Sequence, residues 1–301
     1  MTHAKFSLIE ILTSLPEVTI VDIGASLIGG TIEPYMALVE RGGAKLIGFE
    51  PDVVEREKLE ARYSRNCKFL PLFIGRGGPA TFHQTNWVYT GSLLEPNSSL
   101  LDRFQMLSEV TLPTAKHAID THRLDDVPGI VAMDFLKMDV QGGELAVLEG
   151  AEQLLKDCLV IQTEVEFIQL YKEQPLFADI DSFLRARGFE FHRFTGFGSR
   201  PFKPFLSMSD TAATGSQQIW SDAVYVRSFM KLDQLTTEQL LKLAIILNDI
   251  IGSVDMCLFV LSELDRRQDN STQMQLAYIS RLNQTGGHHV GLSIAAKALD
   301  P

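Results

Sequence analysis

The chain has 301 residues, of which 45% are hydrophobic and 22% charged, a composition typical of a folded globular protein. Its net charge of −11 argues against general binding to nucleic acid or anionic membranes, since both require a positive field. Three scattered cysteines without metal-ligand spacing indicate reduced thiols and a cytoplasmic protein. We expect no secretory signal in the first 20 residues. Charged residues interrupt the most apolar window, 240–261, so we also expect no membrane span.

The first part of the chain alternates between helix and strand patterns. A short amphipathic helix is predicted at 5–14. It is followed by a strand at 18–23, a helix at 31–41, a strand at 45–49, a helix at 53–64 and a strand at 68–75. Strands and helices that alternate with short connections predict a doubly wound, mostly parallel sheet.

The pattern is irregular over 75–123 and becomes regular again at 134. The sequence predicts a strand at 134–140, a helix at 143–157, a strand at 158–167 and a helix at 177–188. Two closing strands are expected at 189–194 and 222–229, the second of them an antiparallel edge strand. The expected fold class is therefore α/β, with a Rossmann-like sheet that is mostly parallel.

The chain changes character after residue 231. We expect a cofactor-binding domain over 1–231 and a C-terminal helical extension over 232–301. Apolar residues between 240 and 261 recur at helical spacing, which predicts two helices with a break near Gly252. Such a stripe packs on the core or on a second subunit, so a homodimer through these helices is also a prediction.

The stretch "VDIGAS", residues 21–26, ends the first strand, and ligands of such sheets bind at strand ends. A dinucleotide loop has the pattern G-x-G-x-x-G, which brings backbone amides to a pyrophosphate. Here Ser26 replaces the middle glycine, and the charge of Asp22 would repel phosphate. The loop instead suits a cofactor with a cationic end, such as the sulfonium and α-ammonium of S-adenosylmethionine. A purely structural turn is the alternative.

An acid also ends the second predicted strand. Glu50, followed by Pro51, can accept hydrogen bonds from both hydroxyls of a ribose. Dinucleotide-binding folds use an acid at the same place, and an acid there also favours a helix N-terminus. Glu50 alone therefore does not discriminate between cofactors, whereas Asp22 together with the broken glycine pattern does.

At these positions the chain resembles the FkbM-type S-adenosylmethionine-dependent methyltransferases. "VDIGAS" is similar to their first cofactor motif and "GFEPD" to their second, and "LKMDVQGGELAVLEGA" resembles their signature around the fourth strand. The similarity extends over about 18–230, and Gln141 stands where many relatives carry an acid. The resemblance implies a class I sheet of seven strands, bound S-adenosylmethionine, and methylation of an oxygen, often a hydroxyl of a sugar or natural product.

The resemblance also implies a set of site residues. Asp22, Gly24 and Ser26 would contact the amino-acid end of the cofactor, and Glu50 would bind its ribose. Phe73 and Ile74, at the end of the third strand, would lie near the adenine, and Asp139 would close the site. The cofactor-binding set is Asp22, Gly24, Ala25, Ser26, Glu50, Pro51, Phe73, Ile74 and Asp139.

A hydroxyl is a weak nucleophile, so methyl transfer to it benefits from a general base. Asp139, at a strand tip, is the first candidate, and Glu164 is preferred to Glu166 on the next strand. Glu144 is equally well explained as an acid of the first helical turn. Four histidines are weaker candidates: His83, His117, His122 and His192. A divalent cation would suit the acids, but nothing in the sequence requires one.

Three functions stay open from the sequence. The first is an O-methyltransferase acting on a small or glycosyl hydroxyl. The second is a nicotinamide-dependent oxidoreductase, against which Asp22 and the missing glycine argue. The third is a non-catalytic module that keeps the cofactor fold for assembly. An anionic acceptor would suit four clustered arginines, although helix ends commonly carry such residues: Arg185, Arg187, Arg193 and Arg200.

Overall fold

The computed structural model describes residues 6–12, 15–27, 30–210, 213–268, 272–286 and 291–292. The chain divides into two compact units. The first contains residues 19–32 and 45–229, and the second contains 1–18, 33–44 and 230–301, in each case as far as they are described. Among the described residues, no helix is both long enough and apolar enough to cross a membrane.

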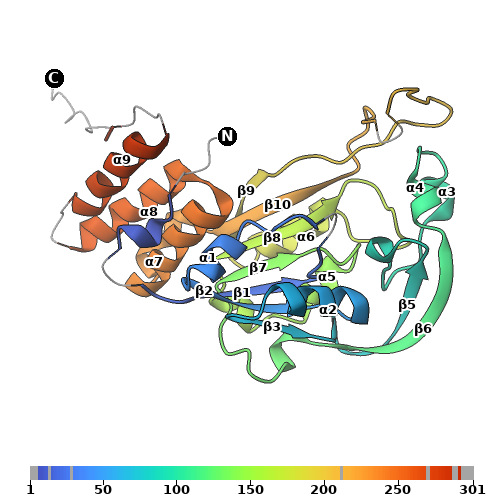
Figure 1. Cartoon of the computed structure of the whole chain (residues 1–301), viewed down its shortest axis with the longest axis horizontal. Coiled ribbons are helices and arrows are strands. Elements are labelled where there is room, and N and C mark those ends of the chain that lie inside the picture. Colours follow the sequence, from blue (N-terminus) through green and yellow to red (C-terminus); the bar gives the residue numbers. More distant parts are fainter. Residues whose placement is uncertain are drawn as a thin grey trace. The chain divides into compact units, whose positions relative to one another are not determined.

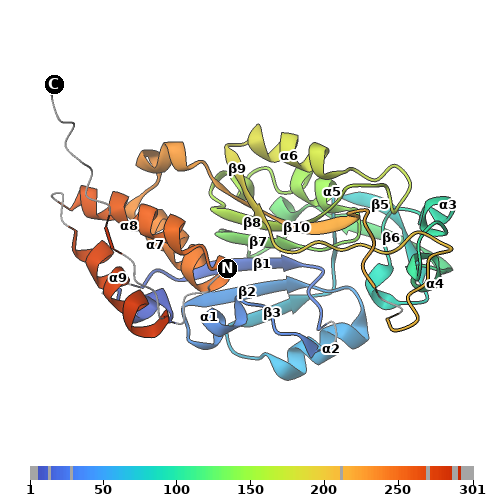
Figure 2. The same ribbon diagram turned by 90° about the horizontal axis from the view of Figure 1, so that it is seen from above.

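A seven-stranded sheet forms the centre of the first unit, in the order β3-β2-β1-β7-β8-β10-β9 (Figure 2). Its pairings β2–β3, β1–β7 and β7–β8 are parallel, as the alternating pattern predicts. The strands are β1 (Val18–Ile23), β2 (Ala44–Phe49), β3 (Cys67–Leu70), β7 (Phe135–Met138), β8 (Val160–Glu166), β9 (Phe189–Phe194) and β10 (Trp220–Arg227). The predicted α/β class with a mostly parallel sheet is confirmed.

The antiparallel strand β10 is not the edge strand that the sequence predicts, but the last but one in the sheet. β10 is antiparallel to both β8 and β9 and lies between them, so β9 is the edge strand. The reason is visible in the residues. Ala223, Val224, Tyr225 and Val226 are all buried, as in a strand covered on both faces, whereas β9 is buried only at Phe189.

A second sheet, in the order β4-β6-β5, carries the irregular region of the sequence (Figure 1). It consists of β4 (Phe73–Ile74), β5 (Gly78–Thr85) and β6 (Pro113–His122). The sequence predicts one strand over 68–75, but the structure divides it into β3 and β4 around Pro71 and Leu72. Proline has no N–H to donate to a sheet, which explains the interruption at Pro71.

The helices of the first unit are short. They are α2 (Val53–Arg62), α3 (Ser98–Leu101), α4 (Leu107–Val110), α5 (Glu144–Glu149) and α6 (Phe177–Arg185). Helices α5 and α6 cover one face of the large sheet, where Val147 and Leu184 share the core with Leu136 of β7 (Figure 2). The helix predicted over 143–157 ends early because Gly150 packs against the carbonyl of Gly75, where a Cβ would be 2.1 Å from the oxygen.

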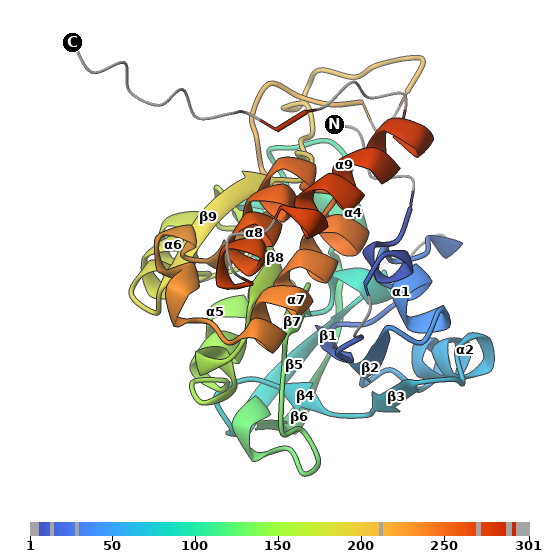
Figure 3. The same cartoon turned by 90° about the vertical axis from the view of Figure 1, so that its left-hand side faces the viewer.

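The second unit is helical (Figure 3). It contains α1 (Met36–Glu40), α7 (Thr237–Ile245), a π-helical turn (Ile246–Ile251), α8 (Val254–Arg267) and α9 (Gln273–Gly286). The predicted break is confirmed at Gly252, which has a φ of +69°. The helix predicted at 31–41 begins only at Met36, after Pro34, because proline disfavours helical backbone in the residue before it.

The N-terminal segment belongs to this helical unit. The sequence predicts a helix over 5–14, but the described residues form only one 3-10 turn, Leu8–Glu10. Asn248 donates to the Phe6 carbonyl at 3.1 Å and accepts from the Tyr278 hydroxyl at 2.8 Å. The carboxylate of Asp249 accepts from the Leu8 amide at 2.9 Å. The Phe6 carbonyl and the Leu8 amide therefore find their hydrogen-bond partners in the C-terminal helices.

Candidate active site

The carboxyl ends of three strands meet at Gly24. The amides of Gly24 and Ala25 both donate to the Phe49 carbonyl, at 3.0 and 3.1 Å, and the Asp139 amide donates to the Ile23 carbonyl at 3.0 Å. Gly24 has a φ of +80°, and a Cβ there would lie 2.0 Å from the Asp139 carbonyl oxygen, so only glycine fits. Because two amides of this turn are engaged within the fold, they are not presented to a pyrophosphate.

Asp22 has a partner that the sequence does not reveal. Asp22 is buried, and Lys137, its register neighbour on β7, brings its ammonium to 3.5 Å from the Asp22 carboxylate. The sequence shows Asp22 as an isolated charge beside a glycine turn, and the structure corrects this, since Lys137 offsets much of that charge. The engaged amides of Gly24 and Ala25 are the better argument against a phosphate.

Glu50 lies half-buried at the end of β2. Its carboxylate accepts from the Asp52 amide at 2.7 Å, and Asp52 in turn caps α2. Burial is the main cause that raises the pKa of Glu50 to about 7, and the negative charges of Asp52, Glu55 and Asp22 add to it. A carboxylate withdrawn from water and surrounded by like charges is stabilised by hydroxyl donors, which is what a ribose offers.

Asp139 and Glu164 lie at the ends of neighbouring parallel strands and are joined by Gln141. The Gln141 side-chain amide donates to Asp139 Oδ1 at 2.8 Å and to Glu164 Oε2 at 2.9 Å. Its own carbonyl accepts from the Tyr171 hydroxyl at 3.0 Å. The structure thus brings the two predicted catalytic acids together and adds Gln141 between them.

Burial shifts the protonation of the acids around this pair. It raises the pKa of Glu164 well above the ordinary value, and the negative charge of Asp139 raises it further. The pKa of Glu166, 2% exposed, is raised by burial and by the negative charges of Glu144 and Asp139. Glu144, 3% exposed, accepts from the Val140 amide at 2.9 Å, and burial raises its pKa to about 7. Acids with raised pKa at a strand edge are suited to accept protons near neutral pH.

Three of these acids are close enough together to share a cation. One oxygen of each of Asp139, Glu144 and Glu164 lies within 4.8 Å of the others. Oxygen ligands suit hard divalent cations. The Gln141 amide, however, directs its two N–H groups at Asp139 and Glu164. A cation bound between these two carboxylates would have to displace that amide.

Phe73 and Ile74, the two residues predicted to lie near the adenine, are not in the strand that the sequence places them in. Ile74 is buried in the core with Leu124 and Leu148, and Phe73 packs against Phe82 with ring centroids 5.1 Å apart. Both belong to β4 of the second sheet and not to the third strand of the large one. This corrects the expected placement, because the chain leaves the large sheet at Pro71 before it reaches them.

The four histidines are distributed over other strands. His83 is on β5, His117 and His122 are on β6, and His192 is on β9. His117 is bound to the Gln84 side chain at 2.7 Å, and His83 is buried with a lowered pKa, mainly through burial. None of these strands pairs with β7, which carries the Asp139 turn. The acids are therefore the stronger candidates for a base.

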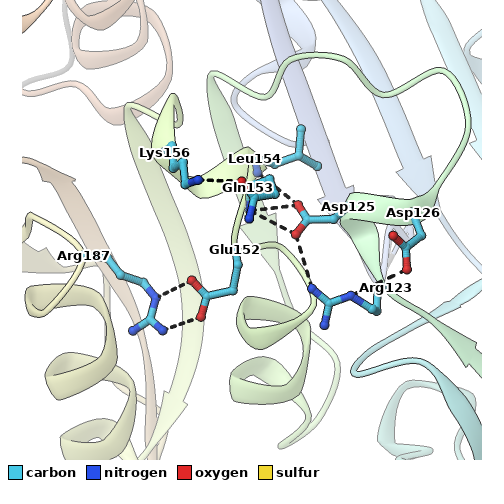
Figure 4. A network of polar contacts seen from close by, with 8 residues as sticks. All are labelled: Arg123, Asp125, Asp126, Glu152, Gln153, Leu154, Lys156 and Arg187. Carbon is cyan, nitrogen blue, oxygen red and sulfur yellow. Dashed lines mark hydrogen bonds and ion pairs between the residues drawn. The ribbon is translucent and has the colours of Figure 1, made fainter.

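Two of the clustered arginines form structural ion pairs. Arg187 binds Glu152 through two nitrogens (Figure 4). Its guanidinium also stacks over the Phe183 ring. Arg185 pairs with Asp181 at 2.8 Å and with Glu190 at 3.1 Å. These interactions favour a role in fastening α6 to its neighbours. They do not support binding of an anionic acceptor by Arg185 or Arg187.

Lys137 and Tyr171 are site residues that the motifs do not indicate. Lys137 is a charged residue inside the apolar strand "FLKM", which is the signal that draws attention to it once the strand is known to be buried. Tyr171 is 1% exposed and lies 30 positions from Gln141, whose side chain it contacts. No local pattern connects residues so far apart in the chain.

A model of the family described as the methyltransferase FkbM domain matches residues 22–191, more than half of the chain. The chain belongs to the FkbM family of S-adenosylmethionine-dependent methyltransferases. As a member of this family it is an enzyme of the methyltransferase class, and its cofactor is S-adenosylmethionine. The family and cofactor predicted from the motifs are confirmed.

The similar proteins and solved structures are also named as methyltransferases. The 2-O-methyltransferase NoeI of Sinorhizobium fredii (strain NBRC 101917 / NGR234) is 29% identical over 184 residues, 55% of this chain and 71% of that protein. The magnesium protoporphyrin IX methyltransferase (ChlM) of Synechocystis PCC 6803 with bound SAM has a TM-score of 0.36 and 15% identity, over 73% of this chain and 74% of that one. A putative methyltransferase from Thermoplasma acidophilum has a TM-score of 0.37 and 10% identity, over 71% and 70%.

The residues at this strand edge fit such a cofactor chemically. Glu50 is a carboxylate short of hydrogen-bond donors, next to a glycine turn that leaves no space for a side chain. The buried Asp22–Lys137 ion pair lies at the end of β1, beside this turn. These observations make the edge between β2, β1 and β7 the candidate cofactor site.

Proposed function

We propose that this enzyme methylates a hydroxyl oxygen of a sugar, a glycoconjugate or a small natural product. The observation that carries the proposal is the pair Asp139 and Glu164, held together by Gln141 at the edge where the strands β1 and β7 end. Methyl transfer to an oxygen benefits from a base, and these two half-buried acids lie where a base would act. The name of the relative, a 2-O-methyltransferase, supports an oxygen acceptor.

The cofactor is proposed to bind along the ends of β1 and β2. Glu50 accepts the ribose hydroxyls, and Gly24, Ala25 and Ser26 line the amino-acid end together with Asp22. Asp139 borders both the cofactor and the acceptor, because its amide is tied to the β1 end while its carboxylate faces Glu164 through Gln141. When bound, S-adenosylmethionine supplies an electrophilic methyl group on a positively charged sulfur.

Glu164 is proposed as the general base and Asp139 as the acid that orients the acceptor hydroxyl. Burial and the charge of Asp139 raise the pKa of Glu164, so the Glu164 carboxylate is a stronger proton acceptor than an exposed glutamate. As the acceptor oxygen becomes nucleophilic, its proton moves to Glu164. Most of the rate enhancement comes from holding the hydroxyl in line with the methyl group, which these residues do by position.

Calorimetric titration with S-adenosylhomocysteine, the demethylated product, tests the cofactor part of the proposal. We expect micromolar binding, about −8 kcal/mol, and no binding of NAD. Glu50→Ala should weaken binding ~10-fold or more, because a charge-assisted hydrogen bond is lost. Glu57→Ala on the exposed face of α2 removes the same charge and should bind as the wild type does. Equal loss in both variants would contradict the role of Glu50.

A screen with radiolabelled S-adenosylmethionine tests the acceptor. The probes are a panel of methyl hexopyranosides and their singly deoxygenated analogues. Transfer that is lost when one particular hydroxyl is absent would support a hydroxyl acceptor and identify its position. Transfer to an amine or thiol probe, with none to the glycosides or other alcohols, would overturn the proposal.

A further inference from the structure

Gln141 is held from three sides at the end of β7. Its backbone has a φ of +58°, in the left-handed region that few non-glycine residues adopt. Its backbone carbonyl accepts from the Ser92 hydroxyl at 2.7 Å. Its side-chain carbonyl accepts from the hydroxyl of the buried Tyr171 at 3.0 Å. A strained backbone that the surroundings fix so completely is typical of a functional position.

These contacts determine which way the side-chain amide points. The Tyr171 hydroxyl, which also lies 3.0 Å from the Thr90 carbonyl, is on the carbonyl side of the Gln141 amide, and the NH₂ group points towards Asp139 and Glu164. A flipped amide would turn its carbonyl oxygen towards two carboxylates, which repel it. The two carboxylates therefore favour the orientation in which Gln141 gives one N–H to each acid.

The amide bridges two acids that would otherwise repel each other. Asp139 and Glu164 come from different strands, and the charge of Asp139 acts unfavourably on Glu164. A donor between them offsets that repulsion and determines which oxygen of each carboxylate is engaged. Their remaining oxygens are then directed in a defined way relative to each other.

We propose that Gln141 is a positioning residue of the methyl-transfer reaction. It holds the carboxylates of Asp139 and Glu164 in the arrangement that receives the acceptor hydroxyl, and its amide occupies the place in which a divalent cation would bridge them. Gln141 acts through the two acids and not on the acceptor itself. The inference rests on the proposed function for the roles of Asp139 and Glu164.

Gln141→Met is the first test, because methionine keeps the shape and the backbone strain of glutamine but donates no hydrogen bond. With the best glycoside of the acceptor panel, we expect kcat to fall about 10- to 100-fold while KM for the acceptor stays within about twofold. The melting temperature and the affinity for S-adenosylhomocysteine should match the wild type. Tyr171→Phe, which removes the hydroxyl that orients the amide, should lower kcat by a smaller factor.

Gln141→Glu tests the same position without any acceptor. It places a carboxylate beside Asp139, Glu144 and Glu164, and we expect this variant to bind Mn²⁺ in calorimetry at micromolar to millimolar concentration. The wild type should bind Mn²⁺ at least tenfold more weakly, because its amide fills the place. Gln141→Met, which removes the amide but adds no ligand, should bind Mn²⁺ more tightly than the wild type and more weakly than Gln141→Glu.

The outcomes separate this inference from the proposed function. If Glu164→Gln is inactive while Gln141→Met keeps full kcat, the positioning role is wrong and the base assignment stands. If Glu164→Gln keeps full activity, the base assignment itself is wrong. Mn²⁺ binding by the wild type that equals binding by Gln141→Glu would overturn the claim that the amide excludes a cation, whichever acceptor is used.

Discussion

Two groups of acids lie near the two ends of helix α5, and they differ in what compensates their charge. Near its N-terminal end, Asp139, Glu144 and Glu164 gather around the uncharged amide of Gln141, and burial raises the pKa values of Glu144 and Glu164. After the helix, Glu152 is bound by Arg187, and that hydrogen bond lowers the pKa of Glu152 (Figure 4).

The second group shows what structural acids look like in this protein. Asp125 accepts from the amides of Gln153 and Leu154 and lies 3.4 Å from Arg123, so its charge caps a turn and meets a cation (Figure 4). The acids near the N-terminal end of α5 are withdrawn from water and accept hydrogen bonds from uncharged amides instead of a cation. Withdrawing a charge from water costs stability, and active sites are where proteins accept this cost.

The largest expected difference between the two groups is in catalysis. Glu164→Gln should lower the rate of methyl transfer by about 10²- to 10⁴-fold, because it removes the proposed base while keeping its shape. Glu152→Gln is the matched control on the other side of α5 and should leave the rate within about twofold. Radiolabel transfer to the best acceptor measures both. Equal rates of methyl transfer in the two variants would contradict the assignment of Glu164 as the base.

A smaller effect is expected on the free energy of unfolding, and it should depend on pH. Glu144 has its pKa raised from 4.5 to about 7, so the folded state holds a proton that the unfolded state releases between these values. Its contribution to the free energy of unfolding therefore falls as the pH rises from about 4.5 to 7. Glu144→Gln should stabilise the protein by about 1–3 kcal/mol at pH 8 and hardly at all at pH 5.

Urea titrations at the two pH values measure this difference. The side-chain carbonyl of glutamine can still accept from the Val140 amide, so the turn itself should survive the substitution. A Glu144→Gln variant that is less stable than the wild type at pH 8 would show that the charged form of Glu144 supports the fold.

The smallest effect is expected at the ion pair after α5. Glu152→Gln should lower the free energy of unfolding by less than about 1 kcal/mol, because the Glu152 and Arg187 side chains are 39% and 30% exposed and water screens them. In 1 M salt the loss should disappear. Urea unfolding at low and high salt gives the comparison, and a loss that persists in high salt would mean that the pair acts through packing rather than charge.

Much of the fold is predictable from the sequence because the strands are local signals. β1 and β2 are continuous apolar runs that end in an acid and a glycine, and both lie where the pattern predicts them. The order of β9 and β10 is harder to predict, because it depends on which of the two runs is buried on both faces. Pro71 is a local signal for the break between β3 and β4, but the apolar residues around it favour one continuous strand.

The site is predictable only in part. Asp139, Glu164 and Glu50 stand at strand ends, and the topology alone brings strand ends to one edge. Lys137 and Tyr171 cannot be placed from the sequence, because their roles depend on register and on contacts between distant parts of the chain. Gln141 lies within the stretch "LKMDVQGGELAVLEGA", but its bridging role depends on where both carboxylates lie in space.

The helical unit has a consequence for anyone who shortens this protein. It is a single body in space but comes from three separate stretches of chain, 1–18, 33–44 and 230–301. A truncated chain that stops at 231 would keep Phe6 and Leu8 while discarding Asn248 and Asp249, which satisfy their backbone. No single truncation can therefore remove the whole helical unit. The tail fused to another enzyme would lack the segments 1–18 and 33–44 that complete the unit.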